Sequence, residues 1–324
     1  MATDIDVLMC AYNEAPHIAR ALASLRSQSV DPKSFRVIFV DNASKDETRR
    51  VVEENSRGLD LEYVYEERPG LNSARNAGYE RARAPYVAHL DADAKAAPGW
   101  IENIRRVIEH ERPDLTGGPI YPYYITEKPA WFQDAYNMDY KGDAPHLLEE
   151  HEFLNGSNMV WRREVVERLG RFNARLGLMA RGLARGDETN LMLQARAEIP
   201  GFKAFYHPDI IVYHLTRPET FSLWYWARRS FSQGSHDREV WNTTSTRRRP
   251  KYLRLAQFLG AATLVGAKGA RALIRRDRAK HPYWKNYCYE LMMPDLYRLG
   301  AIWGLAQRSE GSSGGSGSGG DGAS

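Results

Sequence analysis

Residues 86–100 read YVAHLDADAKAAPGW, and this stretch gives the strongest indication of the fold. Its first five residues form a short apolar run, of the length of one buried β-strand, that ends abruptly at Asp91. Asp91 and Asp93 then stand one residue apart where the chain leaves the predicted sheet. Ligands of an open α/β sheet bind outside the carboxyl ends of its strands, so we expect both carboxylates at a binding edge.

The spacing of the two aspartates suits a hard divalent cation. One carboxylate can ligate Mg²⁺ or Mn²⁺ while the other holds a sugar or ribose hydroxyl or a metal-bound water. The metal would then neutralise a departing diphosphate. An isolated pair at this spacing is more typical of an Asx turn that closes a strand. The motifs on either side favour the metal interpretation.

The first hundred residues alternate apolar runs with amphipathic segments, which is the pattern of βα units on a mostly parallel sheet. We expect strands at 6–11, 36–40, 61–66 and 86–90, and helices at 15–28, 47–55, 73–83 and 99–110. After Gly118 the pattern weakens, and the aromatic, proline-bearing residues 121–139 are expected to form a loop wall or lid. Further elements are expected as a strand feeding a helix at 155–170, a strand at 205–214 and helices across 221–308.

Polar groups also follow the first two predicted strands. Ala11, Tyr12, Asn13 and Glu14 end the first, and Asp41 ends the second, with Ser44 and Asp46 beyond it as capping residues. Each group alone is typical of ordinary helix capping. Together they place polar side chains at adjacent strand ends, where a nucleotide base and ribose would sit.

The bulk composition predicts a globular protein. The 324 residues are 43% hydrophobic and 27% charged, which is enough to build a substantial core. Cys10 and Cys288 form no CxxC pair and no disulfide framework, which favours a reducing cytoplasm. We expect neither a signal peptide nor a membrane span, because the longest uncharged apolar stretch, 255–267, is shorter than the roughly 20 residues that a span needs.

Basic residues concentrate late in a chain whose formal net charge is only +4. They are Arg247, Arg248, Arg249, Lys251, Arg254, Arg271, Arg275, Arg276, Arg278 and Lys280. This distribution suits an anionic membrane surface better than a DNA groove, so we expect no nucleic-acid partner. The apolar stretch 255–267 between the clusters predicts either an amphipathic element on the inner face of the plasma membrane or a helix packed on the catalytic domain.

Six motifs together resemble the family 2 glycosyltransferases of the GT-A fold, over about residues 5–235. They are AYNE (11–14), VDNASKDET (40–48), GLNSARNAGYERARAPYVAHLDAD (70–93), NGSNMVWRREVVERLGRF (155–172), GDETNL (186–191) and VYH (212–214). The resemblance implies an α/β fold of GT-A, Rossmann-like type, with a mostly parallel sheet flanked by helices and a helical C-terminal extension. We therefore expect a catalytic domain at 1–235, a basic helical region at 236–309, and a flexible Gly/Ser tail or added linker at 310–324.

The resemblance also implies a nucleotide-sugar site. Asp41 would accept a hydrogen bond from the base, and the base and ribose pocket would be lined by Ala11, Tyr12 and Glu14. Arg75, in the family's ARN segment, would lie near the diphosphate and contact phosphate through its guanidinium, unless it is a surface helix charge. The DxD element would be formed by Asp91, Ala92 and Asp93.

The same resemblance assigns a metal site and an acceptor loop. Asp93 would bind the metal, and His214 would complete the metal or diphosphate site, unless it is a packed structural histidine. The cofactor would be Mn²⁺ or Mg²⁺. The sugar- and acceptor-facing loop would be formed by Asn155, Gly156 and Ser157, for which a turn before a strand is the alternative.

The catalytic base is expected in the GDE sequence at 186–188. The resemblance aligns Glu188 with the base, but this chain ends the acid pair in glutamate, so Asp187 stays a second candidate. The base must take a proton from the acceptor hydroxyl as that oxygen attacks the anomeric carbon. An acidic first turn that satisfies the helix dipole is the alternative. In the basic stretch 217–234, Arg228, Arg229 and Gln233 would contact diphosphate or an anionic acceptor carrier, or form a solvated face.

The implied function is that of an inverting, metal-dependent, hexosyltransferase-like enzyme. It would move a sugar from a nucleoside-diphosphate sugar, by default a UDP-sugar with GDP and dTDP open, to a hydroxyl of a glycan or lipid-linked acceptor. A nucleotidyltransferase is one alternative, but its usual Gly-rich basic loop is replaced here by AYNEAPH. A non-catalytic nucleotide-sugar-binding protein is another, and the acid pair at 187–188 argues against it.

Overall fold

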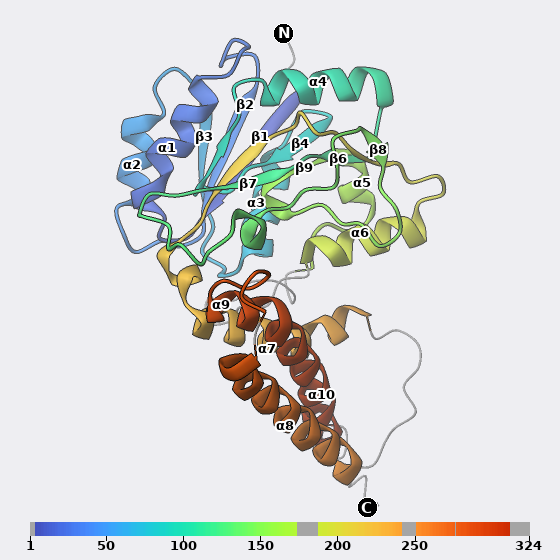
Figure 1. The fold of residues 1–324 in the computed structure, drawn as a ribbon. Helices are drawn as coiled ribbons and strands as arrows, with labels where there is room; N and C mark the ends of the chain where they lie inside the picture. The colour runs from blue at the N-terminus through green and yellow to red at the C-terminus, as the bar shows by residue number, and fades with distance from the viewer. Residues whose placement is uncertain (1–3, 174–186, 242–250, 276, 312–324) are drawn as a thin grey trace, which may run out of the picture. The chain divides into compact units, whose positions relative to one another are not determined.

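A computed structural model describes residues 4–173, 187–241, 251–275 and 277–311 (Figure 1). The chain divides into two compact units. The first unit holds residues 1–182 and 186–218, and the second holds residues 183–185 and 219–324. The expected boundary of the catalytic domain at residue 235 stays a prediction.

The first unit is built on one large, mostly parallel sheet with the strand order β3-β2-β1-β4-β9-β6-β10-β8. Its strands are β1 (Ile5–Ala11), β2 (Arg36–Asp41), β3 (Asp60–Tyr65), β4 (Tyr86–His89), β6 (Leu115–Gly117), β8 (His146–Leu147), β9 (Met159–Arg162) and β10 (Ala204–Tyr206). The first four are mutually parallel, and β9 runs antiparallel between β4 and β6. The predicted mostly parallel sheet is therefore confirmed.

Helices cover both faces of this sheet and create two hydrophobic cores. The helices are α1 (Ala15–Arg26), α2 (Thr48–Asn55) and α4 (Trp100–Glu111), which contribute to one core, and α3 (Leu71–Arg81), α5 (Arg163–Arg168) and α6 (Asp187–Glu198), which contribute to the other. In β1, Val7 and Met9 enter the first core and Leu8 enters the second. A strand buried on both faces needs an apolar residue at almost every position, which explains the run IDVLMC.

A second, three-stranded sheet has the order β5-β11-β7. Its strands are β5 (Ala94–Ala96), β7 (Ile120–Tyr123) and β11 (Val212–Leu215). The single strand expected at 205–214 is wrong, because a turn closed by Ile210 N–H donating to the His207 carbonyl (3.2 Å) separates β10 of the large sheet from β11 of the small one. Pro208 lies in this turn, where its missing N–H is tolerated. The segment 121–139, expected to be irregular, begins within β7.

Among the described residues, two short 3₁₀ turns lie in the first unit and a third begins at its last residue, and the second unit is helical, as the sequence predicts. The turns are η1 (Asp134–Asn137), η2 (Gly156–Asn158) and η3 (Pro218–Phe221), and the helices are α7 (Leu223–Trp241), α8 (Lys251–Arg275), α9 (Trp284–Tyr287), the π-helical η4 (Cys288–Met292) and α10 (Met293–Gly311). A methyl group at Gly300 would lie 1.9 Å from the Phe231 carbonyl oxygen, so α10 and α7 approach through glycine. Among the described helices, none has the length and apolarity to cross a membrane.

Candidate active site

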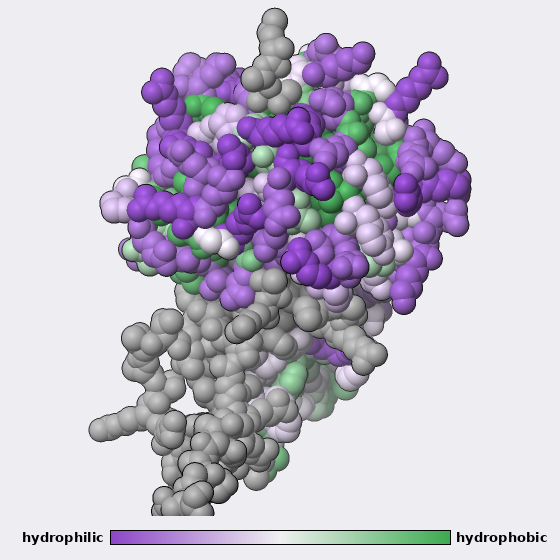
Figure 2. Space-filling model, turned by 180° about the vertical axis from the view of Figure 1, so that it is seen from behind, coloured by the Kyte–Doolittle hydropathy of each residue, from purple (hydrophilic) through white to green (hydrophobic). Residues whose placement is uncertain are grey.

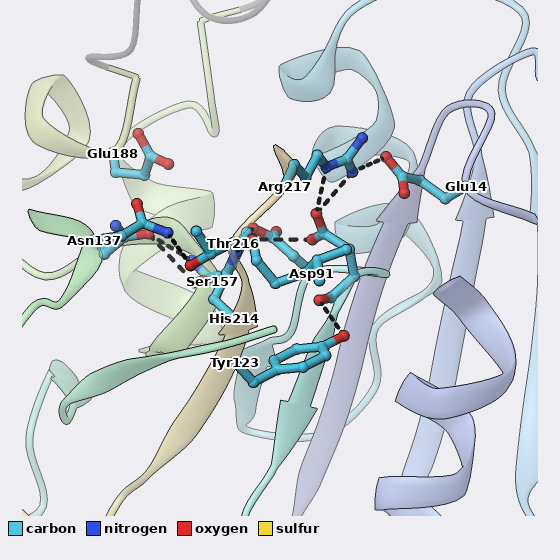
Figure 3. Close-up of polar contacts among 12 residues, drawn as sticks. Glu14, Asp91, Tyr123, Asn137, Ser157, Glu188, His214, Thr216 and Arg217 are labelled. Atoms are coloured by element: carbon cyan, nitrogen blue, oxygen red, sulfur yellow. Dashed lines mark hydrogen bonds and ion pairs between the residues drawn. The ribbon is translucent and has the colours of Figure 1, made fainter. Parts of the chain in front are cut away.

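Asp91, Asp93 and His214 form a cluster at the carboxyl end of β4 (Figure 3). One ligand atom from each residue lies within 4.8 Å of the others. His214 Nε2 is 3.2 Å from Asp91 Oδ2 and 3.3 Å from Asp93 Oδ1. The three-stranded sheet brings these residues together, because His214 on β11 pairs in register with Ala94, the residue that follows Asp93.

The alternative of an Asx turn does not describe the two aspartates. The turn after β4 is closed by the backbone, with Ala94 N–H donating to the Asp91 carbonyl at 3.0 Å. The Asp91 carboxylate faces His214, and the Asp93 carboxylate faces both His214 and Arg217. His214 is partly exposed in this cluster rather than packed in a core. The carboxylates of both aspartates thus face side chains of the cluster rather than the backbone of their own turn.

The chemistry of this donor set fits a divalent cation. His214 Nδ1 lies 3.2 Å from the Leu215 carbonyl oxygen. In the tautomer whose Nδ1–H donates to that carbonyl, Nε2 is a lone-pair donor that faces two carboxylates, and a backbone carbonyl is a common orienting partner for a metal-binding histidine. Two carboxylates and one imidazole are ligands that Mn²⁺ accepts readily, while Mg²⁺ prefers oxygen alone.

Arg217 is a site residue that the sequence analysis did not single out. Its Nε and Nη2 donate to Asp93 Oδ2 at 3.2 and 2.7 Å, and Nη2 also donates to Glu14 Oε1 at 2.5 Å (Figure 3). The Asp93 main chain is held in turn, because Tyr123 O–H donates to its carbonyl at 3.1 Å. The sequence signal that could have identified Arg217 was its position, three residues after His214 and at the start of the basic stretch 217–234.

Burial and charge act differently on the two acids that share Arg217. Burial and the neighbouring Asp93 raise the pKa of Glu14, and Arg217 only partly offsets them. Burial would also raise the pKa of Asp93, but His214 and Arg217 outweigh it and hold that pKa below its usual value. Glu14 Oε2 is buried without a hydrogen-bond partner among the described residues. Such an atom is suited to accept a ligand hydroxyl.

A second constellation joins Arg75 and Glu188. Arg75 Nη2 donates to Glu188 Oε1 at 3.1 Å, and the Arg75 side chain is 3% exposed, so it is not a surface charge. The Phe172 ring lies 5.2 Å from the guanidinium carbon. Glu188 stands in the first turn of α6, while the side chain of its neighbour Asp187 lies outside the described residues. A buried cation needs such a partner, because an unpaired one is costly.

The loop at 155–157 supports this ion pair. A methyl group at Gly156 would lie 2.1 Å from Glu188 Oε1 and 2.4 Å from Arg75 Nη2, so a larger residue would displace the pair. Asn155 caps η2, since its Oδ1 accepts from Ser157 N–H at 3.2 Å. The loop is thus a turn before a strand, and it also shapes the space beside Glu188.

Cys10 connects the two constellations. It lies on β1, where burial raises its pKa to about 12, Arg75 acts to lower the pKa and Asp91 acts to raise it. One thiol is therefore within electrostatic reach of both the Arg75–Glu188 pair and the acidic cluster. The two groups lie at the same end of the large sheet.

The predicted nucleotide end is organised by two strand-end loops. Asp41 Oδ1 accepts from Ser44 N–H at 2.9 Å, and Oδ2 accepts from Tyr63 O–H at 2.6 Å. Asn13, at a φ of 55°, ties the loops together, since its N–H donates to Ser44 Oγ (2.9 Å) and its Oδ1 accepts from Lys45 N–H (2.8 Å). A base that donates to Asp41 would use the second lone pairs of these oxygens.

The remaining predicted residues differ in exposure. Ala11 and Ala92 are buried and contribute main chain at the strand ends, while Tyr12 is exposed beside them. Arg228 and Arg229 lie on α7 of the second unit, where Arg229 sits 5.0 Å from the Trp226 ring. Gln233 lies on the same helix. The roles expected for these six residues stay predictions.

Residues 6–170 match the sequence model of the family described as Glycosyl transferase family 2. Among curated proteins, glycosyltransferase AglE of Haloferax volcanii is 28% identical over 241 residues, which are 73% of this chain and 74% of AglE. The glucosyl-dolichyl phosphate glucuronosyltransferase of the same organism is 26% identical over 182 residues, 53% of this chain and 57% of that protein. This chain therefore spans only part of each relative.

Two solved structures share the fold. The mannosyltransferase PcManGT of Pyrobaculum calidifontis, in complex with GDP-Man and Mn²⁺, has a TM-score of 0.63 at 20% identity, covering 95% of this chain and 88% of its own. S. aureus TarS 1-349 with UDP has a TM-score of 0.50 at 15% identity, covering 96% and 92%. The family match extends over half of the chain and includes β1, β4 and both aspartates. The chain belongs to glycosyl transferase family 2 and is a glycosyltransferase of the GT-A fold.

Proposed function

We propose that this glycosyltransferase is an inverting, divalent-metal-dependent enzyme that transfers a hexose from a nucleoside-diphosphate sugar to an acceptor hydroxyl in glycan, polysaccharide or glycolipid synthesis. The observation that carries the proposal is the cluster of Asp91, Asp93 and His214 beside the Arg75–Glu188 pair. We place the reaction in the cytoplasm, in keeping with the two free cysteines.

The donor end of the reaction depends on the acidic cluster. Asp93, His214 and Asp91 would hold Mn²⁺ or Mg²⁺, which when bound neutralises charge on the departing diphosphate. Arg217 lies against Asp93 and Glu14, so its guanidinium is placed to meet phosphate oxygens. Glu14 Oε2 is suited to a ribose hydroxyl, and Asp41, with Ala11 and Tyr12, would hold the base. The imidazole among the ligands favours Mn²⁺ over Mg²⁺.

The acceptor end depends on Glu188, with Asp187 as the second candidate base. Arg75 holds the Glu188 carboxylate in place, and Gly156 leaves room for it. The carboxylate would take the proton of the acceptor hydroxyl as the oxygen attacks the anomeric carbon from the face opposite the diphosphate. One displacement of this kind inverts the anomeric configuration and forms no covalent glycosyl-enzyme.

We choose the donor base and the acceptor from the solved structures and the relatives. PcManGT carries GDP-Man and TarS carries UDP, so folds of this kind accept both bases. We keep a UDP-sugar as the default donor, with GDP- and dTDP-sugars as the competitors. Because a relative acts on a glucosyl-dolichyl phosphate, a lipid-linked acceptor is the leading candidate.

A donor panel tests the proposal. We expect one of the UDP-, GDP- or dTDP-sugars to raise the melting temperature only when Mn²⁺ or Mg²⁺ is present, and Asp93→Ala to abolish both that shift and turnover. NMR of the product formed with the active donor should show an inverted anomeric centre. Full activity of Asp93→Ala, or turnover unaffected by EDTA, would refute metal dependence. A retained anomeric configuration would refute the single displacement.

A further inference from the structure

Helix α8 presents an apolar stripe to solvent. The stripe consists of Leu259, Thr263, Gly266, Ala270, Leu273 and Ile274, all of them exposed. These residues follow the spacing i, i+4, i+7, i+11, i+14 and i+15, which is one face of an α-helix. Leu273 is 67% exposed and Ile274 is 83% exposed. A helix with this surface has an unpartnered apolar side.

The opposite side of α8 is already packed within the second unit. Val265 is buried, Phe258 lies 5.5 Å from the Trp303 ring of α10, and Lys268 forms an ion pair with Asp295 of α10. Gly269 faces Met292, whose Cε would lie 3.2 Å from a methyl group there. The rotation of α8 about its axis is therefore fixed by contacts, and the stripe cannot turn inward without breaking them.

The stripe has no unsatisfied polar side chain. Its one hydroxyl, on Thr263, donates to the Leu259 carbonyl of its own helix at 2.8 Å. A methyl group at Gly266 would meet open space, so no protein atom covers that position. Leu264, on the same helix but outside the stripe, is 64% exposed.

Exposed aliphatic side chains concentrate on this helix. Among the described residues, the Leu and Ile side chains that are more than half exposed are Leu147 in the first unit and Leu259, Leu264, Leu273 and Ile274 on α8. The first unit has a different surface, and Figure 2 shows hydrophilic residues predominating on one of its faces. An apolar surface gathered on one helix marks an interaction site rather than ordinary scatter.

Charge identifies the occupant of the stripe. Residues 241–276 contain nine Lys and Arg residues and no Asp or Glu. Two copies of this segment would each carry the same excess of positive charge, which opposes their association through the stripe. An anionic bilayer offers both an apolar interior for the stripe and negative headgroups for the flanking cations.

We propose that α8 lies in the plane of an anionic lipid bilayer, with Leu259, Leu273 and Ile274 inserted below the headgroups, while the positive charge of residues 241–276 attracts the anionic headgroups. The inference stands on the α8 surface alone and does not rest on the proposed reaction. If both hold, the membrane that binds the second unit can also supply a lipid-linked acceptor.

Vesicle flotation with the full-length chain tests the proposal. We expect binding at about 50 mM NaCl to phosphatidylcholine vesicles that contain about 30% phosphatidylglycerol, and much weaker binding to phosphatidylcholine alone. The double variant Leu273→Glu with Ile274→Glu should bind more than about tenfold more weakly, because it removes apolar insertion and adds like charge to the lipid. Leu147→Glu, the same change at an exposed leucine of the first unit, should bind as the wild type does.

Two further readouts separate the outcomes. Circular dichroism and the donor-induced thermal shift of the double variant should match the wild type, which shows that the fold and the first unit are intact. Analytical ultracentrifugation without lipid should show no self-association through the stripe. Absence of wild-type binding to the anionic vesicles, equal binding by the double variant, or a dimer that this variant dissociates would each overturn the proposal.

Discussion

At the scale of single residues, Glu188 is the side chain whose chemistry can be isolated most cleanly. Replacing it with glutamine keeps its shape and its contact with Arg75 but removes the ability to accept a proton. We expect Glu188→Gln to lower kcat by about 10² to 10⁴-fold. The donor-induced thermal shift should be retained, since the carboxylates of the metal cluster are unchanged.

Glu198→Gln, at the exposed end of the same helix, is the matched control and should keep wild-type kcat. Steady-state kinetics with the active donor measures both variants. If Glu188→Gln is fully active, proton removal belongs to another group, and Asp187→Asn becomes the variant to measure.

Arg217 gives a second prediction at this scale, about the metal rather than the proton. Its guanidinium binds the Asp93 carboxylate, which is also a proposed ligand of the divalent cation. In Arg217→Ala this competing positive charge is lost, so we expect Mn²⁺ alone, without donor, to bind about tenfold more tightly. Isothermal titration calorimetry measures the affinity directly.

The control for Arg217 is Arg106→Ala, which removes an exposed arginine from an ion pair with Asp209. Its Mn²⁺ affinity should stay at the wild-type value, since the long-range effect of an exposed charge is screened. Weaker Mn²⁺ binding by Arg217→Ala would show that Arg217 arranges the carboxylates instead of competing with the cation.

Sequence reasoning reached Asp91 and Asp93 from their place at the end of a predicted strand, and His214 through the resemblance of the VYH element to the family. Arg217 escaped it because the position of a long, flexible side chain is set by its partners. Here those partners, Asp93 and Glu14, are 124 and 203 residues away in the chain. Partners at such separations leave no local pattern.

At the scale of elements, the regular βα units were predictable from periodicity, and the small sheet was not. The strands β1, β2, β3 and β4 show apolar runs bounded by polar loops, and each lies within a few residues of its prediction. β5, β7 and β11 have three or four residues each and acquire their pairing from partners across the chain. The predicted strand at 205–214 failed for the same reason, since the switch between sheets depends on that pairing.

The 3₁₀ turn η2 gives a prediction about how an element positions the Arg75–Glu188 pair. Gly156→Ala would place a methyl group where the Glu188 carboxylate and the Arg75 guanidinium now meet. A displacement of about 1 Å at a reacting group costs about 10²-fold in rate, so we expect kcat to fall by about that factor. The thermal shift with donor and Mn²⁺ should persist, because Asp91 and Asp93 follow β4 and His214 lies on β11, outside this turn.

Gly260→Ala is the control for the glycine substitution, since a methyl group there meets open space and favours the helix. It should keep wild-type kcat and lose no stability. Wild-type kcat in Gly156→Ala would mean that the Arg75–Glu188 pair can shift without consequence for the reaction.

At the scale of the whole molecule, the sequence predicted a catalytic α/β part and a basic helical part, divided at residue 235. The structure has one α/β unit and one helical unit, and the division of labour between them stays a prediction. The family pattern extends over the first 170 residues and so says little about the second unit. We inferred membrane binding by the second unit from its surface. The stripe on α8 can be recognised only once the packed side of the helix is known.

The two units also predict how the chain unfolds. The first unit has its own two hydrophobic cores, so heating should give two transitions in differential scanning calorimetry rather than one. By the proposed function, a donor and Mn²⁺ would bind only the folded first unit, and at about 100 times Kd they would stabilise it by about 2.7 kcal/mol. This should raise only its transition, by roughly 5 to 10 °C for a unit of this size.

Hydrogen exchange read by mass spectrometry assigns the two transitions. With donor and Mn²⁺ present, amides of β1 and β4 should exchange more slowly, whereas amides of α8 and α10 should keep their rates. The reason is that a ligand slows the unfolding only of the unit that contains its binding site. Anionic vesicles should do the reverse and slow exchange in α8. A single transition that rises as a whole with the donor would show that the two units unfold as one.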